Sequence, residues 1–330
     1  MSKLENVTKE WFNENIKDEN KNFVEEFLTQ AHLSPKTLVQ YQSALYQFFK
    51  FIHDKCENKL LTELKPRDAL KYQNFLINRG LSSSAVKLKR SAVSSLCGYI
   101  ELYYADENPL FRNIYNKKIP NPPIAFKNKK EPLDKEEFDN LVDELVNKEE
   151  WQMIAYLMFT FETGCRREES RQLLRSFVNH AKIKDPVTGE TKKYYMTSEI
   201  RCKGRGREGK IRKFPVGELA MIALKKWDEI RGEDDCEFMF VNKTKDGLTA
   251  QVVASTFNYW CTEVFGKIVG RRVHPHLIRS SRATVLSNSL DENGKPITIE
   301  KIQKLLGHES PDTTKIYIIK EGEDELDDLF

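Results

Sequence analysis

Two arginines and a histidine stand where they could act together on a phosphate. Arg166 follows Gly164 at a predicted helix boundary, and Glu169 comes one helical turn later, where its carboxylate could hold the guanidinium. His276 and Arg279 are spaced i, i+3, so a helix would present both on one face. A proton-transferring imidazole beside a permanently charged guanidinium suits chemistry at a phosphate. Taken alone, the first pair is more typical of a surface ion pair.

A third segment combines a histidine with a tyrosine near the end of the sequence. Gly307 is predicted to end one helix, and Ser310 with Pro311 begins the next, which carries Tyr317. His308 lies in the tight connection between them, where a short loop fixes its position. A single tyrosine on such a helix usually serves packing. Its chemical role therefore depends on its combination with the other two segments.

Together the three segments resemble the ordered boxes of the tyrosine recombinase, or phage integrase, family. TGCRREE is similar to the family's TGLRxxE box, HPHLIR to its HxLR box, and LLGHESPDTTKIY to its LLGHxSxxTTxxY box. The helical first half looks like the family's core-binding domain, so the resemblance covers nearly the whole chain. It implies a site-specific DNA recombinase that cuts and rejoins DNA in integration, transposition or resolution, through a 3′-phosphotyrosyl intermediate.

The resemblance also implies a catalytic set, which is Arg166, Glu169, Lys203, His276, Arg279, His308 and Tyr317. Tyr317 would attack the scissile phosphodiester while the two arginines clamp the negatively charged transition state. A phenol has an unperturbed pKa of about 10, so it needs cations and a base, for which His276 is the candidate. Bond energy is conserved in the phosphotyrosine, so we expect no cofactor and no metal.

Three departures from the family pattern bear on this set. Ser280 stands where the family often has a second histidine, and Cys165 stands where it usually has a leucine. The β-hairpin that carries the catalytic lysine is also longer than usual. Lys203 matches the family's general acid best, and Lys210 remains an alternative. His308 is expected to hydrogen-bond the phosphate.

The predicted elements indicate a mainly α fold with a small antiparallel β-sheet in the catalytic domain, arranged as a two-domain clamp. We expect a helical core-binding (SAM-like), DNA-binding domain over 1–115, a linker over 116–132, and a catalytic domain with a C-terminal tail over 133–330. Strand signals cluster at 194–200, 211–216 and 238–241. Helices are predicted at 23–28, 35–52, 66–80, 82–103, 134–145, 151–161, 218–230, 251–264, 276–290, 299–306 and 311–320.

Charge is distributed unevenly along the 330 residues, although the formal net charge is only +3. The run Arg201–Lys213 holds seven basic residues and one acid, and the run Lys117–Lys130 holds five lysines and no acid. Such runs suit a phosphate backbone, although a solvated loop is the commoner explanation of a single run. The expected DNA contacts are Lys87, Lys89, Arg90, Lys117, Lys118, Arg205 and Arg207.

Composition and resemblance together give the expected surroundings and partners. No apolar run is long enough to span a membrane, and the six scattered cysteines form no metal or disulfide pattern, so we expect a cytoplasmic protein. The resemblance implies double-stranded DNA with inverted-repeat core sites, bound by a homotetramer on two sites. The short stretch before Phe23 predicts no arm-binding domain, and accessory proteins leave no signal. The acidic tail, which ends in Leu-Phe, is expected to dock on a neighbouring protomer.

Two other functions stay open at this point. A type IB topoisomerase shares the Arg-Lys-Arg-His-Tyr chemistry but needs no partner protomer. A DNA-binding protein that has lost catalysis would keep the fold alone. The GHxSxxTTxxY-like segment favours the recombinase, and every catalytic residue type that the family requires is present.

Overall fold

The structure, a computed structural model, describes residues 4–115, 119–123, 131–204, 209–244, 246–307 and Thr314. The chain divides into two compact units: unit 1 is built on Met1–Asn128, and unit 2 on Lys129–Lys203 with Gly209–Phe330. The described elements are mostly helices, with a few short antiparallel strands, which confirms the expected mainly α fold class. None of the helices in these described ranges is long and apolar enough to cross a membrane.

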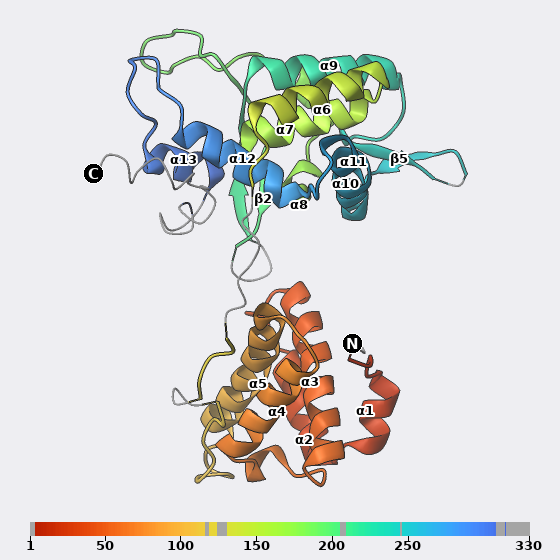
Figure 1. Cartoon of the computed structure of the whole chain (residues 1–330), viewed down its shortest axis with the longest axis vertical. Helices are drawn as coiled ribbons and strands as arrows, with labels where there is room; N and C mark the ends of the chain where they lie inside the picture. Colours follow the sequence, from red (N-terminus) through yellow and green to blue (C-terminus); the bar gives the residue numbers. More distant parts are fainter. Residues whose placement is uncertain are drawn as a thin grey trace. The chain divides into compact units, whose positions relative to one another are not determined.

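Unit 1 is a bundle of helices with well-defined starts. Ser34 and Ser82 act as N-caps, and their side chains accept hydrogen bonds from the backbone N–H groups of Thr37 (3.1 Å) and Ala85 (3.3 Å). The elements are α1 (Lys9–Asn15), α2 (Asp18–Leu28), α3 (Pro35–Lys55), the 3₁₀ turn η1 (Leu61–Glu63), α4 (Pro66–Asn78) and α5 (Ser83–Tyr103) (Figure 1). The sequence did not predict α1, because Phe12 is its one buried residue and gives no periodic stripe.

The two ends of the predicted linker pack on their own units. In unit 1, Arg90 donates hydrogen bonds to the carbonyls of Ile119 (3.0 Å) and Pro120 (2.8 Å). In unit 2, Arg271 donates to the carbonyl of Pro132 (2.7 Å) and pairs with the carboxylate of Glu137 (2.6 Å). The described part of this segment is therefore anchored at both ends by arginines, although its sequence has no apolar periodicity.

Unit 2 is built around a buried helix, α7 (Trp151–Thr163), which packs against both α6 (Lys135–Asn147) and α9 (Glu218–Arg231) (Figure 1). The predicted capping box at the start of α6 is confirmed, because Asp134 accepts from the N–H of Glu137 (2.7 Å) and Glu137 accepts from the N–H of Asp134 (3.1 Å). The remaining helices are α8 (Arg167–Ser170), η2 (Arg175–Asn179), α10 (Ala254–Tyr259), the π-helical η3 (Trp260–Phe265), α11 (Gly266–Val269), α12 (Pro275–Ser287) and α13 (Ile299–Leu306).

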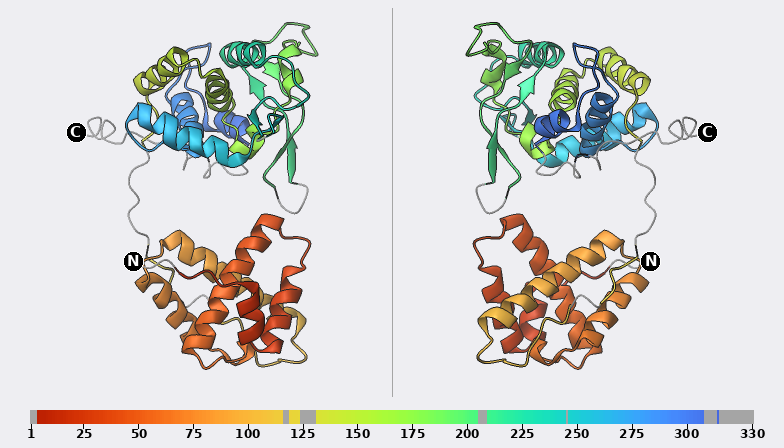
Figure 2. Two further views of the ribbon diagram at one scale, coloured as in Figure 1. Left: turned by 90° about the vertical axis from the view of Figure 1, so that its right-hand side faces the viewer. Right: turned by 90° about the vertical axis from the view of Figure 1, so that its left-hand side faces the viewer.

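The described strands form three two-stranded antiparallel ladders. They pair β1 (Tyr195–Met196) with β4 (Pro215–Val216), β2 (Ile200–Cys202) with β3 (Lys210–Arg212), and β5 (Val241–Lys243) with β6 (Thr249–Gln251). The β2–β3 hairpin projects from the helical body of unit 2 (Figure 2).

Two predicted boundaries in unit 2 were wrong. The strands predicted at 194–200 and 211–216 each divide in two, because the Thr197 hydroxyl takes the place of a ladder partner and accepts from the N–H of Phe214 (2.9 Å). The helix predicted from Gln251 begins at Ala254 instead, since residues 249–251 pair with β5. The apolar periodicity of the segment could not show this pairing.

Candidate active site

The guanidinium of Arg279 bonds two other elements of unit 2. Its Nη1 donates to the carbonyl of Gly164, and its Nη2 donates to the carbonyl of Leu306 at 2.8 Å. Gly164 is the C-cap of α7 and Leu306 is the last residue of α13, while Arg279 itself lies on α12. The side chain is fully buried, at 0% exposure. One residue therefore joins three elements that are far apart in the sequence.

The turn that carries Arg166 is held by Glu169. The Glu169 carboxylate accepts from the backbone N–H of Arg166 (2.7 Å) and from its guanidinium Nη1 (2.9 Å). The Glu169 side chain is 2% exposed and that of Arg166 is 25% exposed. A surface ion pair would leave both groups in water, so this arrangement is of another kind: a buried carboxylate fixes one face of a partly exposed guanidinium.

Glycine is required where α7 ends. Gly164 has φ +60°, in the left-handed region, and terminates the helix as the sequence predicted. A Cβ on Gly164 would lie 2.4 Å from Cδ2 of Leu306. The end of α7 thus approaches the end of α13 closely, and this approach brings the Arg166 turn to the carbonyl that Arg279 contacts.

The two histidines at the start of α12 have different environments. His274 is the N-cap of the helix, and its Nδ1 accepts from the N–H of Leu277 at 3.0 Å. His276 is exposed and lies one turn before Arg279, as predicted. His274 thus caps the helix, and the role of His276 as the proton-transferring histidine stays a prediction. Ser280 follows Arg279 and is buried, with its hydroxyl donating to the carbonyl of His276 at 2.9 Å.

Both candidate lysines lie on the β2–β3 hairpin and are exposed. Lys203 directly follows β2, and Lys210 on β3 is paired with Cys202. Paired residues share a face of an antiparallel ladder, so Lys210 lies on the same face as Cys202. Lys203, the next residue along, is beyond the last ladder pair. The hairpin places both lysines at its end, and the choice between them stays a prediction.

Two buried thiols near Arg166 are unsuited to nucleophilic chemistry. Burial raises the pKa of Cys165 to about 11, and the Glu169 carboxylate adds to this effect. Burial and Glu169 also raise the pKa of Cys202 to about 12, against a smaller opposing effect of nearby arginines. Both thiols therefore stay protonated near neutral pH. Among the described residues, no cluster of three or more His, Cys, Asp or Glu side chains could hold a metal.

Several predicted residues lie outside the described part of the chain. They are Lys117, Lys118, Arg205, Arg207, His308 and Tyr317, together with the helix predicted at 311–320 and the tail. Gly307, directly before His308, is described and is the left-handed C-cap of α13 with φ +67°. Thr314, three residues before Tyr317, is fully buried.

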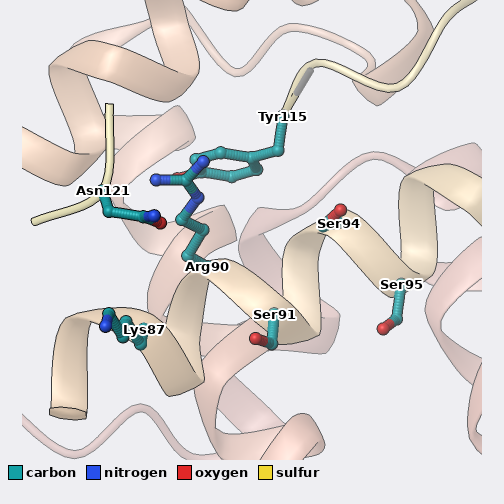
Figure 3. A pocket seen from close by; sticks show the side chains of 7 residues that line it. All are labelled: Lys87, Arg90, Ser91, Ser94, Ser95, Tyr115 and Asn121. Carbon is teal, nitrogen blue, oxygen red and sulfur yellow. The ribbon is translucent and has the colours of Figure 1, made fainter. Parts of the chain in front are cut away.

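In unit 1, the predicted DNA contacts on α5 are not alike. Lys87 is exposed, and it lines a hollow of about 460 Å³ together with Ser91, Ser94 and Ser95 (Figure 3). The Arg90 guanidinium lies over the ring of Tyr115, 5.2 Å from its centroid, and is bonded to backbone carbonyls.

Lys89 is half-buried, donates to Gln47, and has a pKa lowered by burial. Lys89 and Arg90 thus have structural partners within unit 1, which their sequence spacing did not reveal. Contact with DNA stays a prediction for all three α5 residues.

Sequence reasoning missed two side chains that hold the hairpin. Gln172 exchanges hydrogen bonds with the backbone of Arg201 on β2, at 2.9 and 3.0 Å. Arg212 on β3 contacts the end of α13. In the sequence, Arg212 stands out only as one charge in a basic run. The available signal was its i, i+2 spacing from Phe214, which is buried, because residues two apart share one face of a strand.

Comparison with known proteins identifies the family. The model of the phage integrase family matches residues 131–323, and the model of the phage integrase N-terminal SAM-like domain matches residues 22–101. The SPbeta prophage-derived recombinase-like protein YomM of Bacillus subtilis (strain 168) is 33% identical over 333 residues, covering 99% of this chain and 95% of that protein. Tyrosine recombinase XerC of Oceanobacillus iheyensis is 27% identical, covering 89% of each chain. This chain therefore belongs to the phage integrase family of tyrosine recombinases.

Solved structures share the fold. The Tn1549 transposon integrase in complex with circular intermediate DNA has a TM-score of 0.66 and 16% identity, covering 94% of this chain and 98% of that chain. A lambda integrase dimer bound to a COC′ core site has a TM-score of 0.63 and 16% identity, covering 94% and 80%. The likeness confirms the mainly helical architecture with small antiparallel sheets.

Proposed function

We propose that this chain is a site-specific DNA recombinase that cuts and rejoins double-stranded DNA through a phosphotyrosyl intermediate. The observation that carries the proposal is the position of the Arg279 guanidinium. It bonds the carbonyl of Gly164, two residues before Arg166, and the carbonyl of Leu306, two residues before His308. One side chain thus connects the three predicted boxes at the place where a phosphate would be held.

The reaction needs negative charge stabilised at a phosphorus atom. Tyr317 attacks the scissile phosphodiester, a 3′-phosphotyrosyl bond forms, and the 5′-oxygen leaves. Arg166 and Arg279 stabilise the phosphorane, and one such preorganised donor is typically worth about 10²–10³ in rate. Because Arg279 is 0% exposed, a DNA phosphate reaches it only after the groups that cover it move aside. We therefore expect DNA binding to rearrange the site.

Protons move on both sides of the phosphorus. His276 is exposed one turn from Arg279 and is our candidate base for the Tyr317 phenol. A lysine of the β2–β3 hairpin, Lys203 or Lys210, protonates the leaving 5′-oxygen. Glu169 keeps the Arg166 fork oriented through its bonds to the guanidinium and to the backbone N–H of the same residue.

We assign different roles to the two units. We assign unit 1 to DNA core binding, with Lys87 and the α5 serines against the phosphate backbone, and unit 2 with the tail to catalysis. Exchange between two duplexes involves four strands, which suits a closed ring of four protomers on two inverted-repeat sites. Phosphotyrosine conserves the bond energy, so the reaction runs without a nucleotide cofactor. We place it in the cytoplasm.

A covalent selection tests this function. Purified protein is mixed with a library of nicked duplexes of random sequence, SDS-resistant complexes are recovered, and their DNA is sequenced. We expect one inverted-repeat sequence to be enriched, and two copies of it to recombine when added back. Covalent complexes without sequence enrichment, with relaxation of any supercoiled plasmid, would indicate a topoisomerase instead. Sequence-specific binding without covalent complexes would indicate a protein that has lost catalysis.

A further inference from the structure

Arg212 joins the lysine hairpin to the end of α13 in unit 2. Its Nη1 donates to the carbonyl of Leu306 at 3.0 Å, and its Nη2 donates to the carbonyls of Lys304 (3.1 Å) and Leu305 (2.9 Å). These are the last three carbonyls of α13, which lack partners within the helix. The guanidinium also lies 4.9 Å from the ring centroid of the buried Phe214.

Because β2 and β3 are paired, the contact of Arg212 with α13 also restricts where the two lysines lie. Arg212 pairs with Ile200, and Lys210 pairs with Cys202 two residues nearer the end of the hairpin. Fixing Arg212 therefore fixes where β3 leaves the body of unit 2, and with it the position of both candidate lysines. The opposite strand has its own anchor, because Gln172 exchanges hydrogen bonds with the backbone of Arg201.

The end of α13 does not depend on Arg212 in the same way. The Leu306 carbonyl also accepts from Arg279, which is buried and bonded to Gly164. Gly307 then allows Arg212 to approach, since a Cβ at this position would lie 1.9 Å from its Nη1. Loss of Arg212 thus leaves α13 held by Arg279 but removes the anchor of β3.

We propose that Arg212 is a positioning residue for the general acid: it holds the lysine hairpin against the end of α13 so that the lysine meets the leaving 5′-oxygen. The inference rests on the proposed function. A guanidinium fork can reach three carbonyls that a single ammonium cannot, and displacement of a catalytic group by about 1 Å costs on the order of 100-fold in rate.

The test compares two nicked DNA substrates of the selected sequence. One has an ordinary phosphodiester and the other has a 5′-bridging phosphorothiolate, whose thiolate leaves with little protonation. We expect Arg212→Lys to lower the rate of covalent complex formation about 100-fold on the ordinary substrate and less than about 5-fold on the phosphorothiolate. The Kd for DNA should stay within about 2-fold of wild type.

Arg231→Lys is the matched control. Arg231 also bonds backbone carbonyls, those of Phe238 (2.6 Å) and Cys236 (2.9 Å), but it belongs to the end of α9. Loss of stability alone would slow both substrates equally in either variant, so the ratio of the two rates isolates positioning. Equal slowing of both substrates by a folded Arg212→Lys protein overturns the inference.

The two proposals fail in distinguishable ways. If the wild-type protein forms no covalent complex with any DNA, the proposed function is wrong. If the wild type cleaves both substrates and Arg212→Lys shows no preference for the phosphorothiolate, the positioning role is wrong and the recombinase function stands. Rescue of Lys203→Ala or Lys210→Ala by the same substrate identifies the lysine that the hairpin presents.

Discussion

Replacing Arg279 or Arg166 by lysine should separate stability from catalysis. The fully buried Arg279 fork makes two carbonyl bonds, and a hydrogen bond to a charged group is worth about 1.5–3 kcal/mol. A lysine ammonium can keep one of the two at most, so we expect Arg279→Lys to lower the free energy of unfolding by about 2–4 kcal/mol. For a domain of this size, that lowers Tm by roughly 4–16 °C.

Arg166→Lys should cost far less stability. The backbone N–H of Arg166 keeps its bond to Glu169, and the side chain is partly exposed, so we expect a loss of about 1 kcal/mol or less. Both variants should nevertheless cleave DNA at least ~100-fold more slowly, because both lose the guanidinium fork that we propose stabilises the transition state.

Stability is measured by calorimetry, and catalysis by trapping covalent complexes on nicked DNA, with the same protein samples. The thermal transition of unit 2 gives the change in Tm, and the rate of covalent complex formation at a temperature well below it gives the change in catalysis. Equal Tm values for the two variants would refute the bracing role of Arg279. Near-normal cleavage by the stable Arg166→Lys protein would refute the clamp.

Three further outcomes are expected. Gly307→Ala and Gly270→Ala both place a side chain at positive φ, which should lower stability by about 1–2 kcal/mol. Only the new Cβ at Gly307 meets a neighbour, Arg212, within 4 Å, so only Gly307→Ala should also slow cleavage in the trapping assay. Arg271 lowers the pKa of Glu137 below 4.5, so this contribution to stability is present above that pH and is lost as the pH falls through the folded-state value. Acid titration of unfolding should therefore be shallower for Glu137→Gln, and identical curves would contradict the pairing. Truncation after Lys320 should leave single-site binding intact in gel shifts but reduce synapsis and recombination, whereas wild-type recombination would exclude docking of the tail in trans.

The sequence predicted the elements that carry chemistry better than the contacts that hold them. The helix ends at Gly164 and Gly307 and the capping box at Asp134 follow from local backbone rules, and all three are confirmed. These rules depend on a few adjacent residues, so one sequence is enough to apply them. The spacing of His276 and Arg279 likewise needs only helical geometry.

The long-range contacts could not be predicted in this way. Arg212 meets α13 across more than 90 residues of sequence, and Arg90 meets Pro120 across 30. A basic run has the same composition whether its side chains face DNA or cap a helix. Arg90 was predicted to contact DNA because it lies on the basic side of a predicted helix, and that pattern could not show that its guanidinium bonds the backbone within unit 1.

Strand boundaries failed for a related reason. Thr197 interrupts its ladder because its hydroxyl accepts a hydrogen bond from the backbone N–H of Phe214, which lies between β3 and β4. Residues 249–251 form a strand because β5 is their partner, although they adjoin an apolar helical pattern. In both places the pairing partner decides the structure, and the partner is not visible in the local sequence.

Mass spectrometry of the covalent complex can show whether Tyr317 forms the bond to DNA. Wild type and Tyr317→Phe are incubated with the nicked substrate, the products are denatured in SDS, and the peptide that retains DNA is identified by mass spectrometry. We expect a 3′-phosphotyrosyl peptide that contains Tyr317 in the wild type. We expect normal DNA binding without any covalent complex in Tyr317→Phe, which lacks only the phenolic oxygen. A covalent complex formed by Tyr317→Phe, or DNA attached to another residue of the wild type, would contradict this role of Tyr317.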